Sequence, residues 1–159
     1  GWIERLTSSG NQVAISPLHD KDRWEHDSPV VVDELTGEIL FEKGERYKCG
    51  DKKKAHWHII VKTEKAVGYM EMNGFIRAIT QGPYIQKCTS LKGAYEYFCH
   101  VNHPERYQYD KDEIQTFNNF VIEANKHEQD LIFAAICIFS ALASPGSADV
   151  EAPLIIVRK

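Results

Sequence analysis

Short apolar runs predict the β-strands of this chain. Val13–Ile15 is such a run and ends at a Ser-Pro pair, whereas Ala55–Lys62 is the strongest strand prediction because aromatic and β-branched residues dominate it. Tyr84–Lys87 predicts a further strand. Between the first two strands lies an inserted segment, residues 24–51, in which apolar runs on both sides of a turn that ends at Gly37 predict a β-hairpin.

Apolar residues at spacings of three and four predict three helices. The first covers Trp2–Leu6, and the second runs from residue 63 or 64 to residue 79. The third begins at Leu91 and ends at about Cys99, with Ser90 as its N-cap. The order of these elements predicts an α+β fold in which helices flank an antiparallel sheet.

The last part of the chain is predicted to be helical. Val121–Ala143 gives a helical stretch, and a linker of small and polar residues separates it from a final apolar segment. The apolar run Leu131–Ala143 is shorter than the ~18 to 20 residues of a membrane-spanning helix, so we expect no membrane association. We therefore divide the chain into a domain over residues 1–122 and a C-terminal helical extension and tail over residues 123–159.

The charge balance excludes a globally basic protein. Nineteen Lys and Arg residues oppose 23 Asp and Glu residues, which gives a formal net charge of −4. Binding to a nucleic acid would therefore have to depend on a local basic patch. The cysteines include no Cys-x-x-Cys pair, which favours free thiols in a reducing cytosol over a disulfide framework: Cys49, Cys88, Cys99 and Cys137.

Three histidines form a candidate metal site. His56 and His58 alternate with Trp57 on a predicted strand, so both imidazoles project from one face of the sheet. Two neighbouring imidazoles are costly to bury unless they share a ligand such as a divalent metal, although two half-exposed histidines would give the same pattern. His19 follows the first strand, and Asp22 could bring a carboxylate to the same place.

The sequence pattern defines the carboxylate ligand and the identity of the metal ion less closely than the three histidines. Asp22 is a better ligand candidate than Asp20, because Asp20 adjoins His19 and would have to turn back. Three histidines and one aspartate suit Mn²⁺, Mg²⁺ with retained waters, or Zn²⁺, and spacing does not separate these. A structural zinc site would normally include cysteine, so the ligand set favours a catalytic metal.

Tyr97 is the candidate nucleophile. In the helix that starts at Leu91, Tyr95 falls on the apolar stripe and is expected to pack in the core. Tyr97 lies about 200° further around the helix, on a face that can point toward a metal site. An exposed tyrosine without a catalytic role would fit this pattern as well. A phenol beside a divalent metal can attack a phosphodiester and form a phosphotyrosyl ester.

Basic residues precede the histidine strand. Lys52, Lys53 and Lys54 run directly into it and could follow a DNA backbone, although such runs are more often simply solvated. The side chains of three aromatic residues could stack on bases, and a core role is at least as consistent with each: Trp24, Trp57 and Tyr84.

Several segments together carry a resemblance to a known family. They are Ala14–Asp22 (AISPLHDKD), Lys53–His58 (KKAHWH), Tyr95–His100 (YEYFCH), Tyr109–Asp112 (YDKD) and Asn118–Phe120 (NNF). With them the chain resembles the plasmid Rep family of rolling-circle replication initiators, which belong to the HUH endonucleases. The histidines precede the tyrosine, as in replication initiators and unlike conjugative relaxases.

The resemblance implies a fold and a set of site residues. It implies a sheet of about five antiparallel strands flanked by helices, one strand short here unless another segment supplies it. It assigns the metal ligands to His19, Asp22, His56 and His58, the nucleophile to Tyr97, and the metal to Mn²⁺ or Mg²⁺. Many relatives have a lysine where this chain has His100, so His100 could contact phosphate, like Lys52–Lys54, or merely pack.

We therefore predict a metal-dependent enzyme that nicks and transfers one DNA strand at a plasmid origin, through a 5′-phosphotyrosine intermediate that initiates rolling-circle replication. The expected partners are single-stranded or hairpin origin DNA and host replication proteins in the cytoplasm, and the C-terminal region could form a homo-oligomer. Two alternatives remain: a catalytically silent origin-binding module with a structural metal, and a transposase of the same superfamily.

Overall fold

The computed structural model describes residues 1–63, 67–80, 85, 90–122 and, for the backbone, 132–138. It divides into two compact units, which we describe separately. The first unit comprises Gly1–His19 together with Ala55–Lys159, and the second comprises Asp20–Lys54.

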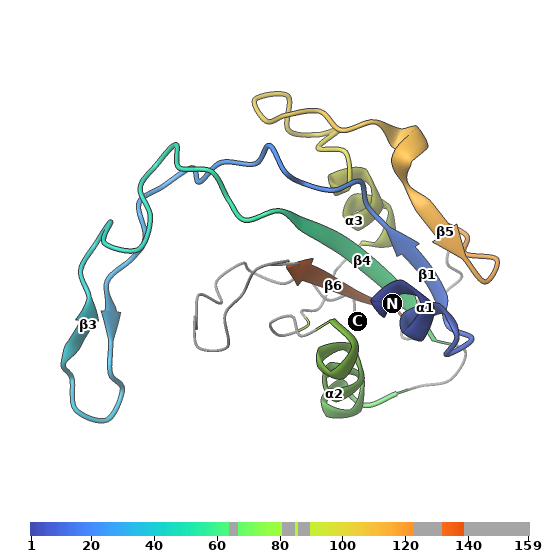
Figure 1. The fold of residues 1–159 in the computed structure, drawn as a ribbon, viewed down its shortest axis with the longest axis horizontal. Helices are drawn as coiled ribbons and strands as arrows, with labels where there is room; N and C mark the ends of the chain where they lie inside the picture. The colour runs from blue at the N-terminus through green and yellow to red at the C-terminus, as the bar shows by residue number, and fades with distance from the viewer. Residues whose placement is uncertain (64–66, 81–84, 86–89, 123–131, 139–159) are drawn as a thin grey trace. The chain divides into compact units, whose positions relative to one another are not determined.

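A four-stranded antiparallel sheet forms the centre of the first unit (Figure 1). Its strand order is β5-β1-β4-β6, with bounds β1 Gln12–Ile15, β4 His56–Lys62, β5 Gln115–Phe117 and β6 Ile132–Ile138. The pairing of β1 with β4 sets Ile15 opposite Ile59. The predicted α+β class and both predicted strands at 13–15 and 55–62 are thus confirmed.

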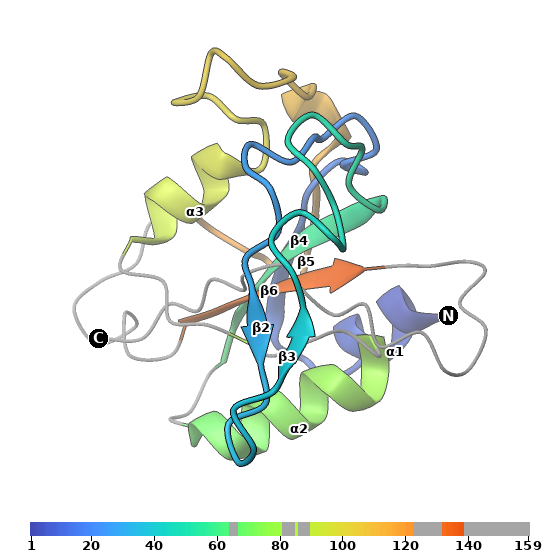
Figure 2. The same cartoon turned by 90° about the vertical axis from the view of Figure 1, so that its left-hand side faces the viewer.

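Helices cover both faces of this sheet (Figure 2). α1 (Trp2–Thr7) and α2 (Tyr69–Thr80) lie on one face, and α3 (Leu91–Tyr97) lies on the other. A short 3₁₀ turn, η1 (Lys111–Glu113), precedes β5. All three helices begin or end close to the predicted positions, except that α2 starts at Tyr69 and not at residue 63 or 64.

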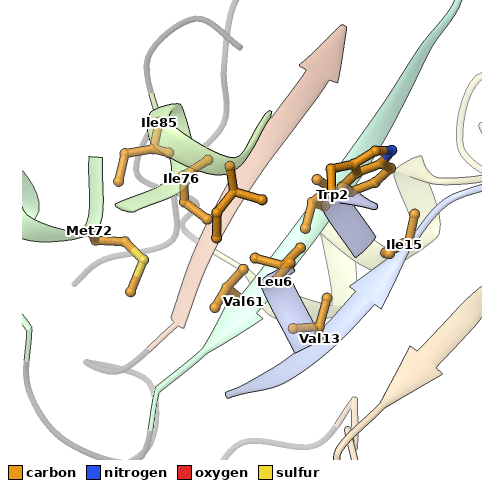
Figure 3. Packing of buried hydrophobic residues seen from close by; sticks show 10 residues of the cluster. Trp2, Leu6, Val13, Ile15, Val61, Met72, Ile76 and Ile85 are labelled. Carbon is orange, nitrogen blue, oxygen red and sulfur yellow. The ribbon is translucent and has the colours of Figure 1, made fainter. Parts of the chain in front are cut away.

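Alternation along the two central strands creates two separate cores. One core lies under α1 and α2 (Figure 3), and it contains Trp2, Leu6, Val13, Ile15, Ile59, Val61, Met72, Ile76, Ile79 and Ile85. The other lies under α3, and it contains Ala14, Ile60, Leu91, Phe98, Cys99 and Tyr109. Because His56 and His58 share the phase of Ile60, both histidines lie on the α3 face.

The second unit contains the predicted hairpin. β2 (Val31–Val32) pairs antiparallel with β3 (Ile39–Phe41), and Gly37 in the connecting turn has a φ of 73°. The carboxylate of Asp33 accepts hydrogen bonds from the backbone N–H groups of Leu35 and Thr36, and these bonds hold the pKa of Asp33 below its usual value. The insertion therefore forms a β-hairpin, as the sequence predicted.

The C-terminal helix prediction is wrong where the structure describes this region. Residues 132–138 form β6, which pairs along its whole length with β4. A continuous apolar run has no polar positions to reveal a period, so the pattern does not separate a buried strand from a buried helix. The free edge of β4 decided the outcome, since its backbone groups require partners.

The predicted sheet of about five strands is confirmed only in part, because four strands are present among the described residues. The predicted strand Tyr84–Lys87 lies outside the described residues, apart from Ile85, which is buried in the core. The short strand β5 was not predicted. The division of the chain at residue 122 stays a prediction.

The cap of α3 supports a stability prediction. The Ser90 hydroxyl oxygen accepts a hydrogen bond from the backbone N–H of Gly93 at 3.0 Å, which satisfies one free donor of the first turn. We expect Ser90→Ala to lower the free energy of unfolding by about 1 kcal/mol, and Ser90→Thr to cost less. Urea denaturation followed by circular dichroism measures this, and equal stability of Ser90→Ala and the unmodified chain would contradict it.

The described residues also bear on the predicted free thiols and on membrane association. Cys49 and Cys99 are free thiols, as predicted, and burial raises the pKa of Cys99. Within the described part of the chain, no helix combines the length and the apolar character that crossing a membrane requires.

Candidate metal centre and nucleophile

Strand pairing continues past the end of β1 and brings His19 to the histidine pair. The backbone N–H of Ser16 donates to the carbonyl of His58 at 2.9 Å, and the N–H of His58 donates to the Ser16 hydroxyl at 2.9 Å. Beyond Pro17, the N–H of His19 donates to the carbonyl of His56 at 2.8 Å, and an isolated antiparallel bridge joins these two residues. Residues far apart in the chain are therefore held side by side by the backbone.

Three imidazole rings meet at this point. The ring centroids of His19 and His58 are 4.5 Å apart, those of His56 and His58 5.0 Å, and those of His19 and His56 5.3 Å. Their exposed fractions are 0% for His19, 5% for His56 and 7% for His58. Each ring offers one ligand nitrogen, and these nitrogens lie within 4.8 Å of one another. Such a set of neutral nitrogen donors fits a divalent transition metal.

The surroundings of His19 fix its orientation. Its Nε2 lies 2.7 Å from the carbonyl oxygen of Phe98, so Nε2 carries the proton and Nδ1 is the nitrogen available to a metal. The ring of Tyr109 stacks on the His19 ring at a centroid distance of 4.1 Å and an angle of 11°. A backbone carbonyl that accepts from the second ring nitrogen is typical of metal-binding histidines.

Tyr97 lies beside this cluster, and Tyr95 does not. The Tyr97 ring packs edge-on against His58 at a centroid distance of 5.2 Å. Tyr95 packs with Phe98 and Phe120 in the core under α3, where burial raises the pKa of its phenol. The two tyrosines thus lie on different faces of α3, as the helical phase predicted.

His100 packs in the interior. It is fully buried, its Nδ1 lies 2.8 Å from the carbonyl oxygen of Tyr107, and its ring is 4.8 Å from that of His19. The backbone of His100 has a φ of 58°, in the left-handed conformation that is common at the end of a helix. The sequence predicted that His100 either contacts phosphate or packs. The geometry supports packing, because a fully buried ring is not accessible to a phosphate.

Asp20 and Asp22, the two carboxylates compared as metal ligands, belong to the second unit. The Asp20 carboxylate accepts a hydrogen bond from Lys21 at 2.9 Å, which lowers the pKa of Asp20. The backbone carbonyl of Asp22 accepts from the N–H of Lys53 at 2.8 Å. The role of the Asp22 carboxylate stays a prediction.

The lysines and tryptophans divide between surface and packed positions. Lys52 and Lys54 are exposed, and the Lys53 ammonium lies 4.8 Å from the centre of the Trp24 ring. Trp24 stacks on Tyr47 at 3.7 Å. Trp57 packs against Trp2, with centroids 5.6 Å apart, which supports a core role for Trp57.

Two residues near the cluster escaped the sequence analysis. Tyr109 supports His19, and Arg106 donates a hydrogen bond to the Tyr97 hydroxyl. Both lie in irregular backbone after α3, where no periodicity indicates which way a side chain points. The only signal was the Tyr109–Asp112 segment, which contributed to the family resemblance without a role.

The fold and the site define a class of protein: an α+β domain that buries a histidine cluster, able to hold a metal ion, on one face of an antiparallel sheet. Residues 34–123 match the family described as plasmid replication protein, origin binding domain. The chain belongs to this family of plasmid replication proteins, which confirms the predicted resemblance. His56, His58 and Tyr97 lie inside the matched region, and His19 precedes it.

Curated relatives agree with the family. The chain is 32% identical over 112 residues to Replication protein RepB of Lactiplantibacillus plantarum, a match that covers 70% of this chain and 40% of the relative. It is 26% identical over 125 residues to a Replication protein of Staphylococcus aureus, and this match covers 77% of this chain and 49% of the relative. The chain therefore spans less than half the length of these relatives.

Proposed function

We propose that this chain nicks one strand of plasmid origin DNA and becomes covalently attached to its 5′ end through Tyr97. The observation that carries the proposal is the convergence of three buried imidazoles beside the half-buried ring of Tyr97. Membership in an origin binding family supports origin DNA as the substrate.

His19, His56 and His58 would hold a divalent metal, with the Asp22 carboxylate as the predicted fourth ligand. The donor set fits such an ion, because three imidazole nitrogens favour Mn²⁺ over Mg²⁺, which prefers oxygen ligands. When bound, the metal would withdraw charge from the scissile phosphate. The Phe98 carbonyl and the Tyr109 ring would keep His19 in the orientation that binding requires.

The chemistry of the proposed step belongs to Tyr97. Its phenol releases its proton to solvent water, and the oxygen attacks the phosphorus in line with the leaving 3′ oxygen. The bond between phosphorus and the 3′ oxygen breaks, the 3′ oxygen takes a proton from solvent water, and a 5′-phosphotyrosine forms. The released 3′ hydroxyl would prime DNA synthesis, and reversal of the step would rejoin a strand.

An adduct assay tests the proposal. The chain is incubated with Mn²⁺ and labelled single-stranded oligonucleotides that tile the plasmid origin, and covalent protein–DNA adducts are separated under denaturing conditions. We expect one adduct at one sequence, lost when EDTA is added. Specific origin binding without an adduct would favour the silent binding module, and joining of the nicked strand to unrelated target DNA would favour a transposase.

The lysine run supports a prediction about DNA binding. If Lys52, Lys53 and Lys54 contact phosphates, replacing all three by Gln should reduce the slope of log affinity against log salt by about 2 for single-stranded DNA. Replacement by Arg should preserve the slope, because the charges remain. Fluorescence anisotropy over a range of salt concentrations measures both, and an unchanged slope in the Gln variant would show that these lysines do not contact the backbone.

A further inference from the structure

An arginine that no sequence pattern indicated contacts the hydroxyl of the proposed nucleophile. The Nη1 atom of Arg106 donates a hydrogen bond to Tyr97 Oη at 2.5 Å, and the guanidinium carbon lies 5.5 Å from the centre of the Tyr97 ring. Arg106 belongs to the loop after α3, beyond the left-handed turn at His100. The loop therefore returns to the last residue of α3 and brings a fixed positive charge to its phenol.

We propose that Arg106 is a further catalytic residue of the strand-transfer reaction. It orients the Tyr97 oxygen for attack and supplies positive charge to the phosphate under attack. This inference rests on the proposed function of Tyr97 and adds a specific second group to that site.

The hydrogen-bonding properties of the two side chains support this role. A guanidinium is a donor only and stays protonated, so the phenol oxygen must be the acceptor in this contact. The hydrogen bond from Arg106 uses one lone pair of Tyr97 Oη and so holds this oxygen in a defined position. A guanidinium carries its N–H donors in one plane, and this geometry suits a phosphate, whose oxygens gain charge as the new bond forms.

The loop that carries Arg106 is held in place before substrate arrives. The side-chain amide nitrogen of Gln108 has two N–H donors and lies within hydrogen-bond distance of three carbonyl oxygens of the same loop, at 3.1 Å from His100, 2.9 Å from His103 and 3.0 Å from Arg106. The Glu105 carboxylate lies 3.9 Å from Arg106 Nε and 3.3 Å from His103 Nδ1. The Arg106 side chain is 23% exposed, so it is largely fixed and still accessible to a phosphate.

Single-turnover kinetics test the inference. Two quantities are measured: the rate of adduct formation at saturating oligonucleotide and Mn²⁺, and the affinity for the same oligonucleotide. Both are measured for the unmodified chain and for three variants: Arg106→Gln, Arg106→Lys and Arg77→Gln. Arg77 is an exposed arginine on α2, which covers the opposite face of the sheet, so it is the matched control. Circular dichroism and Mn²⁺ affinity confirm that each variant keeps its fold and metal site.

We expect Arg106→Gln to slow adduct formation by about 10²-fold or more, as for loss of a transition-state donor, with DNA affinity changed by less than about threefold. Arg106→Lys should recover part of the rate, because it restores the charge without the planar donor geometry. Arg77→Gln should react at the original rate.

Three results would overturn the role of Arg106. They are an unchanged rate in Arg106→Gln, a loss of rate matched by an equal loss of DNA or Mn²⁺ affinity, and an Arg106→Lys variant as slow as Arg106→Gln. Failure of the inference is distinguishable from failure of the proposed function. If Tyr97→Phe is inactive while Arg106→Gln reacts normally, only Arg106 is excluded, whereas adduct formation by Tyr97→Phe would reject the proposed function itself.

Discussion

Tyr97→Phe is expected to abolish the covalent protein–DNA adduct, with a loss on the order of 10³-fold or more, because it removes the hydroxyl oxygen that forms the phosphotyrosyl bond in the proposed mechanism. The variant keeps the aromatic ring that packs against His58, so its fold and its Mn²⁺ affinity should not change. Denaturing electrophoresis with a 5′-labelled downstream strand measures the adduct directly.

Tyr95→Phe is the matched control for this prediction. It makes the same chemical change two residues earlier in α3, on the face that packs in the core with Phe98 and Phe120. The adduct should form at the original rate. An inactive Tyr95→Phe together with an active Tyr97→Phe would reverse the assignment of the nucleophile.

His58→Ala and His56→Ala are expected to lower Mn²⁺ affinity and adduct formation, each by about 10²-fold or more. Removal of an outer-shell partner lowers metal affinity or activity by about 10- to 100-fold, and we expect a loss at or above the upper end of that range because a direct ligand is removed. Binding of origin DNA should remain, since the proposed phosphate contacts come from the lysine run. Titration calorimetry with Mn²⁺, in parallel with the adduct assay, measures both effects.

Two further variants make the metal prediction specific. His26→Ala removes an exposed histidine of the second unit and should leave Mn²⁺ affinity unchanged. Asp22→Asn tests the predicted carboxylate ligand and should weaken Mn²⁺ binding if that carboxylate coordinates the ion. If His58→Ala loses DNA binding in proportion to metal binding, the metal has the structural role of the silent-module alternative.

The agreement between sequence and structure is best where a residue's position depends on its own element. The two-residue period of a strand placed His56 and His58 on one face, and β4 has them there. The rotation of a helix separated Tyr95 from Tyr97, and α3 separates them in the same way. The hairpin followed from local turn chemistry at Gly37.

The failures occurred where a partner distant in the chain decided the outcome. Residues 132–138 have an apolar pattern that suits a helix or a strand, and the open edge of β4 made them a strand. The short strand β5, which was not predicted, likewise depends on its pairing with the distant strand β1.

By itself, the sequence determined the class of fold, the family, and which side chains share a face within each strand or helix, because these follow from local periodicity and short motifs. Only the tertiary structure decided that His19 lies opposite His56, that Tyr109 stacks on His19, and that Arg106 reaches the hydroxyl of Tyr97. These contacts depend on strand register and on the course of an irregular loop, and both are set by packing between distant segments.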